Sequence, residues 1–141
     1  MIKNASAVWH GGFKKGRGTI STETGALNKA AYGFRARFED GVGTNPEELI
    51  GAAHAACFSM AFSLLLEQAG LTPDKIETQA AVTLDKLDDE FVISASHLTV
   101  RARVPGADQA RFEQIASAAK NGCPVSKLLN TKITMEATLE T

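Results

Sequence analysis

The stretch from Leu49 to Leu66 contains no formally charged residue, and it constrains the fold more than any other part of the chain. Strong helix-start signals precede it. Asn45 suits the N-cap, Pro46 suits the first helical position, and Glu48 stands three residues after the cap. Apolar or small residues then occupy nearly every face, so we predict a central, enclosed helix rather than an amphipathic surface helix.

This helix lies at the lower length limit for a membrane span. Polar residues such as His54 dilute its hydrophobicity, and Glu47, Glu48 and Glu67 close its ends. We therefore predict a core helix of a soluble protein, with no membrane contact. The segment from Met1 to His10 lacks the apolar run of a secretory signal, which indicates a cytoplasmic protein.

Strand patterns flank the helix on both sides. We predict strands at Ala5–His10, Thr19–Thr22 and the alternating Tyr32–Phe38, a hairpin of Ile76–Leu87 and Phe91–Val104, and a closing strand over Ile133–Leu139. Asp108 should cap a helix running to about Lys120, and Cys123 should cap another that has Pro124 at its first position.

This order predicts an α+β fold, with an antiparallel sheet packed on a long buried central helix. The length suits a single domain over residues 1–141. A helix this apolar is more than one small chain can cover, so we expect a dimer.

The composition excludes some functions. Of 141 residues, 44% are hydrophobic, and the formal net charge is −1. The chain has no excess of basic residues that would indicate nucleic-acid binding. The glycines at positions 11, 12, 16 and 18 lack the G-K-[ST] ending of a phosphate-binding loop. A small molecule or a protein remains the expected partner.

The two cysteines are either inert core thiols or redox-active ones. Apolar surroundings raise the pKa of a thiol, so Cys57 needs a nearby cation to react. Helix N-terminal amides, in contrast, would stabilise a Cys123 thiolate. The candidate cations are Arg17, Arg35 and Arg37. Spacing alone also allows Arg37 to be a solvated strand residue.

His54 and Cys57 form an H-x-x-C pattern on one helix face. No further pair shows ligand spacing, so metal binding is disfavoured. A Cys–His nucleophilic pair for acyl transfer lacks an orienting third residue. We interpret His54 as a packed core histidine.

Three segments together resemble the OsmC/Ohr family, and the OsmC branch more closely than the Ohr branch. They are Thr44–Leu49 (T-N-P-E-E-L), Ala52–Phe58 (A-A-H-A-A-C-F) and Gly122–Ser126 (G-C-P-V-S). The resemblance implies an OsmC-like fold, an intertwined homodimer, and a peroxidase active in oxidative and osmotic stress defence.

The resemblance also implies the roles of four residues. Cys57 attacks the peroxide and becomes a sulfenic acid, Cys123 resolves it to a disulfide, and Glu47 holds Arg37 over the thiolate. The Ohr branch takes its arginine from the glycine-rich segment, where this chain has Lys15 and Arg17.

The implied substrate is an organic hydroperoxide, with hydrogen peroxide reduced more weakly. The implied reductant is an external dithiol, for which the family suggests a dihydrolipoyl protein. No metal, haem or flavin is required. Two alternatives remain: a binding module with Cys57 lining its pocket, which would tolerate Cys57→Ser, and a cysteine acyl transferase or esterase, which would not need Cys123.

Overall fold

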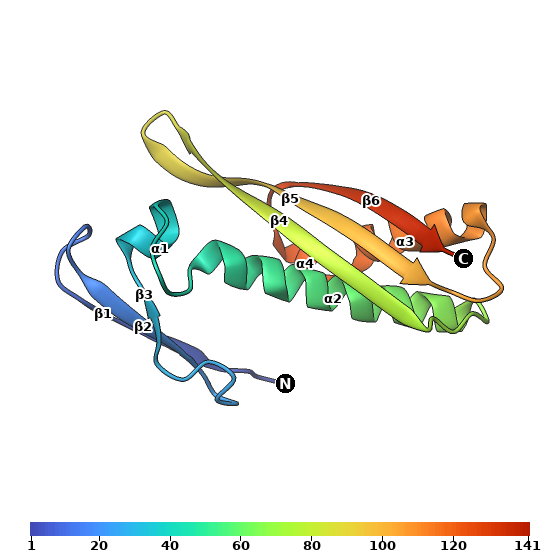
Figure 1. Ribbon diagram of the computed structural model, residues 1–141, viewed down its shortest axis with the longest axis horizontal. Helices are drawn as coiled ribbons and strands as arrows, with labels where there is room; N and C mark the ends of the chain where they lie inside the picture. The colour runs from blue at the N-terminus through green and yellow to red at the C-terminus, as the bar shows by residue number, and fades with distance from the viewer. The chain divides into compact units, whose positions relative to one another are not determined.

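The computed structural model describes residues 1–141 and divides them into two compact units, 1–49 and 50–141. The boundary lies in the first turn of helix α2 (Pro46–Gln68), which is labelled in Figure 1. The expectation that 1–141 forms one domain stays a prediction.

The first unit is built on a three-stranded antiparallel sheet. Its strands are β1 (Ala5–His10), β2 (Arg17–Thr22) and β3 (Ala30–Tyr32), in the order β1-β2-β3. The strands predicted at Ala5–His10 and Thr19–Thr22 are confirmed. Gly18 permits close packing of the sheet against its aromatic residues, because a Cβ there would come within 2.3 Å of the Tyr32 ring.

The prediction of a strand over Tyr32–Phe38 is wrong beyond Tyr32, since α1 (Phe34–Phe38) is a short helix. In a five-residue segment, positions i and i+4 share a face in a strand and in a helix alike, so the alternation could not separate the two. The helix stacks Phe34 on Phe38 at a centroid distance of 5.0 Å. It also pairs Arg35 with Glu39 at i,i+4.

The second unit contains a sheet in the order β4-β5-β6. Strands β4 (Lys75–Leu87) and β5 (Glu90–Arg103) form the predicted antiparallel hairpin. The closing strand β6 (Lys132–Glu140) lies parallel to β5, so the antiparallel expectation holds for every strand pair except this one. A parallel neighbour needs a crossover connection, and α3 (Gln109–Gly122) and α4 (Pro124–Leu128) supply it.

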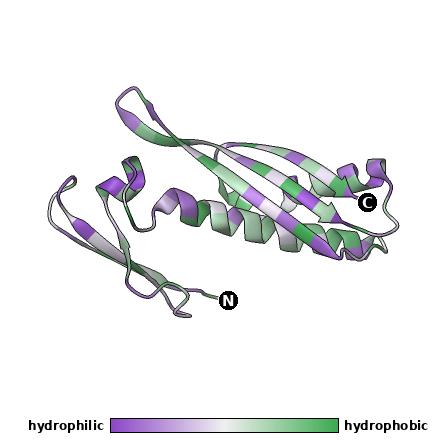
Figure 2. Cartoon of the chain, viewed as in Figure 1, coloured by the Kyte–Doolittle hydropathy of each residue, from purple (hydrophilic) through white to green (hydrophobic).

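The core of this unit lies between its sheet and the helices. On β5, alternate residues from Ser96 to Ala102 are buried. Figure 2 shows the corresponding alternation of hydropathy along β4 and β5. Leu98, Val100 and Ala102 pack in one cluster with apolar residues of α2 and α3: Phe58, Phe62, Leu66, Phe112, Ala116 and Ala119. The predicted cap of α3 is confirmed, because the Asp108 carboxylate accepts the Arg111 N–H at 2.8 Å.

Helix α2 is buried along one face only. Gly51, His54, Phe58, Phe62 and Leu66 recur every three or four residues and are all buried. On the opposite side, Met60 is 77% exposed and Leu64 is 54% exposed. By length and composition α2 could cross a membrane, but its packed face is that of a core helix. The prediction of an enclosed helix therefore holds for one face only. The other face is not covered within a single chain, as the apolar composition of the helix led us to expect.

Candidate active site

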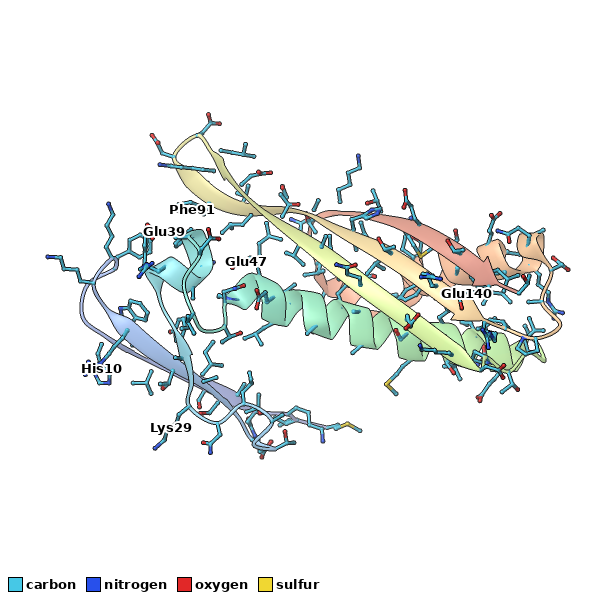
Figure 3. The ribbon with its side chains drawn as sticks, viewed as in Figure 1. His10, Lys29, Glu39, Glu47, Phe91 and Glu140 are labelled. Atoms are coloured by element: carbon cyan, nitrogen blue, oxygen red, sulfur yellow. The ribbon has the colours of Figure 1, made fainter.

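Arg37 and Glu47 form a bidentate ion pair in the first unit. Arg37 Nη2 and Nε donate to Glu47 Oε1 at 2.9 and 3.1 Å. The Glu47 side chain, labelled in Figure 3, is only 10% exposed, whereas that of Arg37 is 36% exposed. Charge-assisted bonds of this geometry fix a guanidinium in orientation as well as position. Arg37 is therefore not the strand residue that spacing alone allowed, but an ion-paired residue of a short helix whose side chain stays partly exposed.

Asn45 sets the geometry of this pair. Its Oδ1 accepts the Glu48 N–H at 2.8 Å, which confirms the predicted N-cap of α2. Its Nδ2 donates to the Ala36 carbonyl at 3.1 Å, which ties α1 to the start of α2. One asparagine thus connects the turn that carries Arg37 to the turn that carries Glu47.

An apolar pocket of about 190 Å³ lies beside Arg37 in the same unit. It is lined by Trp9, Phe13, Tyr32, Gly33, Phe34, Arg37 and Phe38. The Phe13 ring meets Phe34 edge-on at 5.2 Å, and Trp9 lies 5.4 Å from Tyr32. A pocket with aromatic walls and one guanidinium suits a small ligand that has an apolar body and a polar or anionic end.

Cys57 and Cys123 come together in the second unit, and both are free thiols. Burial is the main cause that raises the pKa of Cys57, and a hydrogen bond with the Cys123 thiol raises it further, while the Val125 backbone N–H lowers it. The net effect of its own unit is to raise the pKa of Cys57 and so to favour the neutral thiol.

Cys123 caps helix α4, as predicted. Its Sγ accepts the Ser126 N–H at 3.3 Å, Pro124 opens the helix, and the Cys123 side chain is fully buried. The Ser126 Oγ lies 3.1 Å from the same sulfur. The resolving candidate is thus held by both the backbone and the side chain of Ser126.

His54 is fully buried, with both ring nitrogens hydrogen-bonded. Nδ1 lies 2.7 Å from Ser96 Oγ on β5, and Nε2 lies 2.8 Å from Ser126 Oγ on α4. Burial lowers the pKa of His54, so the imidazole is neutral at neutral pH. His54 therefore does not form the Cys57 pair that acyl transfer would need. No group of three or more His, Cys, Asp or Glu side chains is placed to hold a metal ion.

Ser96 and Ser126 are the residues that sequence reasoning missed. Two signals pointed to them. Ser96 is a polar residue on the otherwise apolar inward face of β5, and Ser126 stands three residues after a predicted N-cap. Each serine satisfies one nitrogen of a histidine that the apolar helix carries into the core.

We expect the free energy of unfolding to fall as the pH falls through about 6.5, the ordinary pKa of histidine. The native pKa of His54 lies below that of the unfolded chain, so in this range the unfolded state binds more protons. The stabilisation is complete above about 6.5. Urea denaturation at a series of pH values measures it.

In His54→Gln, this part of the pH dependence should disappear, whereas His10→Gln, at an exposed position, should keep it. An unchanged slope in His54→Gln would contradict the assignment of His54 as a buried neutral imidazole.

Comparison with known proteins agrees with this architecture. The family model described as "OsmC-like protein" matches residues 39–138. Peroxiredoxin OsmC of Escherichia coli (strain K12) is 54% identical over 98% of this chain and 96% of its own length. The organic hydroperoxide resistance protein OhrB of Bacillus subtilis is 28% identical over 87% of this chain and 89% of its own length.

Solved structures show the same fold. The crystal structure of OhrB from Bacillus subtilis superposes with a TM-score of 0.69 at 26% identity, covering 97% of this chain and 98% of that one. An OsmC-like protein from Mycoplasma pneumoniae reaches 0.78 at 15% identity, covering 100% and 99%. The expected α+β OsmC-like fold and the expected peroxidase class are confirmed. The chain belongs to the OsmC-like protein family.

Proposed function

We propose that this protein reduces organic hydroperoxides to alcohols through Cys57 and Cys123. The observation that carries the proposal is the contact between two free thiols, one of them half-buried and the other fully buried. The names of its relatives, a peroxiredoxin and an organic hydroperoxide resistance protein, support the same chemistry.

The reaction has three steps. The Cys57 thiolate attacks the distal oxygen of ROOH, the O–O bond breaks, and the alkoxide takes up a proton and leaves as ROH. Cys57 is then a sulfenic acid. Cys123 attacks its sulfur, a disulfide forms, and the hydroxide that leaves is protonated to water. An external dithiol restores both thiols by exchange, becoming a disulfide itself.

Arg37 is the activating cation in this proposal, with Glu47 as its anchor. The pKa of Cys57 is raised in its own unit, so a positive charge has to come from another part of the protein. A cation at a few ångströms lowers the pKa of an acid by about 1–3 units. The Arg37–Glu47 pair supports this role. A guanidinium that a buried carboxylate already holds in one orientation does not have to reorient when negative charge develops during the reaction.

The aromatic pocket supports an organic substrate. Its walls accept an alkyl or aryl group, and its volume of about 190 Å³ suits a small one. Hydrogen peroxide has no apolar part to bury there, so it should react more weakly. For the reductant we propose a dithiol of the dihydrolipoyl type, and for the location the cytoplasm, where such dithiols are kept reduced.

We also propose that the working form is a homodimer. Met60 and Leu64 lie on the exposed side of α2, and large apolar side chains in a row on one helix favour burial against a second protein surface. A second copy of α2 presents the same residues and so provides a self-complementary surface.

Intact mass spectrometry tests the thiol chemistry. Reduced protein treated with one equivalent of cumene hydroperoxide should lose two hydrogens. Cys123→Ser should gain one stable oxygen, because the sulfenic acid has no resolving partner, and Cys57→Ser should not change. A wild-type mass that stays constant for minutes would reject the peroxidase chemistry and favour a binding module.

Arg37→Ala should slow the oxidation of Cys57 about 100-fold at pH 7, because the thiolate and the developing charge lose their cation. In Arg37→Lys the oxidation rate should lie between those of wild type and Arg37→Ala, since lysine keeps the charge but cannot make the bidentate pair. The matched control is Arg35→Ala, whose side chain is exposed and pairs with Glu39 instead of Glu47. Competition kinetics against a reference thiol measures the rates, and equal loss in both alanine variants would refute the assignment.

Leu64→Glu should convert the protein to a monomer, because the glutamate would be buried without a partner in the dimer. Sedimentation velocity should give twice the chain mass for wild type and the chain mass for the variant. Gln114→Glu places the same charge at an exposed position of α3 and should remain dimeric. A monomeric wild type would contradict the proposal.

A further inference from the structure

A line of four hydrogen-bonded side chains runs through the core of the second unit, and the three-step reaction above does not use most of it. Ser96 Oγ, His54, Ser126 Oγ and Cys123 Sγ are joined in sequence by distances of 2.7, 2.8 and 3.1 Å. The four residues come from β5, α2, the third position of α4 and its N-cap. All four are buried, so no bulk water competes for these bonds.

The donors and acceptors in this line are compatible with two directions of polarity, and only one of them leaves a ring nitrogen of His54 free to accept a proton from the side of Cys123. A neutral imidazole has one N–H donor and one acceptor nitrogen. If Nδ1–H donates to Ser96, Nε2 accepts the Ser126 O–H, and Ser126 Oγ is then free to accept the Cys123 S–H. In this arrangement every bond of the line points the same way, from Cys123 to Ser96, and Nε2 is the proton acceptor that faces Ser126.

We infer that His54, acting through the Ser126 hydroxyl, takes up the proton of Cys123 when that thiol attacks the Cys57 sulfenic acid. In these terms Ser126 is a catalytic residue that touches the reacting sulfur, and His54 is a positioning residue that acts through it. The inference rests on the proposed function, since it concerns the second step of that reaction.

The step balances without any further reactant. The Cys123 proton passes to Ser126 Oγ while Ser126 passes its own proton to His54 Nε2, and the sulfur forms the new S–S bond. The Cys57 S–O bond breaks, and the hydroxide that leaves becomes water by taking up one proton. His54 returns to neutral by releasing one, so the net products are a disulfide and water. During reduction the same line can return a proton to the departing Cys123 thiolate.

The line predicts a distinctive pH profile for disulfide formation. His54 accepts protons only while neutral, and burial keeps it neutral to a lower pH than usual. The other titratable groups on the elements packed around it lie mostly at their ends. On α2 these are Cys57 and, near the two ends of the helix, Glu47, Glu48 and Glu67. Cys123 caps α4, which carries the exposed Lys127. On β5, His97 points to the opposite face from Ser96 and bonds Thr134. The rate should therefore stay nearly flat over the neutral range.

Rapid-quench mass spectrometry of the dimeric protein with excess cumene hydroperoxide separates the two steps. The oxygen adduct reports oxidation of Cys57, and its loss reports disulfide formation. In Ser126→Ala the loss should be about 10- to 100-fold slower near pH 6.5 and should speed up about tenfold per pH unit, because only ionised thiol then reacts. Oxidation itself should be unchanged.

Two further variants distinguish proton transfer from support of the fold. His54→Gln retains one donor and one acceptor for the two serines but cannot hold the proton, so it should resolve as slowly as Ser126→Ala. Ser126→Thr restores the hydroxyl and should recover the wild-type profile. The control is Ser59→Ala, which removes a hydroxyl on α2 that bonds Ala55 and Thr78 and lies outside the line. It should not change the rate of disulfide formation.

The outcomes are distinguishable. If folded Ser126→Ala and His54→Gln form the disulfide at the wild-type rate and pH profile, the relay is wrong and the peroxidase stands. If only Ser126→Ala is slow, the hydroxyl orients Cys123 and His54 holds no proton, which also overturns the inference. If wild type gives no oxygen adduct and no disulfide, the proposed function fails and the relay fails with it.

Discussion

The packing of α2 on β5 is the contact on which the second unit depends. Phe58, Phe62 and Leu66 are fully buried against the inward face of the strand. Each such side chain contributes about 1.5–3 kcal/mol of burial free energy. The same rotation of the helix that buries these residues also buries His54 one turn earlier and leaves Cys57 beside it at the edge of the core. The geometry of the thiols is a consequence of how the core is filled.

The residues of the proposed reaction lie in both units, Arg37 and Glu47 in the first and the two thiols in the second. A core that raises the pKa of Cys57 cannot also ionise it, and it offers no buried cation for the purpose. The guanidinium that the proposed reaction requires is held elsewhere, by a carboxylate at the start of the same helix that carries Cys57. Helix α2 carries Glu47 in its first turn and Cys57 further along, so one helix contributes a residue to each of the two groups.

His54 is a polar residue at a core position where an apolar residue would be less costly to bury. A buried imidazole costs stability unless both nitrogens have partners, and two serines from separate elements provide them. An apolar residue would fill this position without needing either serine. The presence of a complete hydrogen-bonded line that ends on a cysteine sulfur is what distinguishes this histidine from ordinary core packing.

The sequence alone determined the features that depend on local chemistry. The N-caps at Asn45, Asp108 and Cys123, the hairpin and the long apolar helix all follow from short-range patterns, and the structure confirms them. Local patterns could not decide between strand and helix at Phe34–Phe38, because five residues are too few to separate the two periods. Only tertiary structure decided the parallel placement of β6 and the meeting of His54 with Ser96 and Ser126, whereas the pairing of Arg37 with Glu47 was expected from the family resemblance. These contacts join residues distant in sequence, and no local pattern encodes which side chain will stand opposite another once the core has closed.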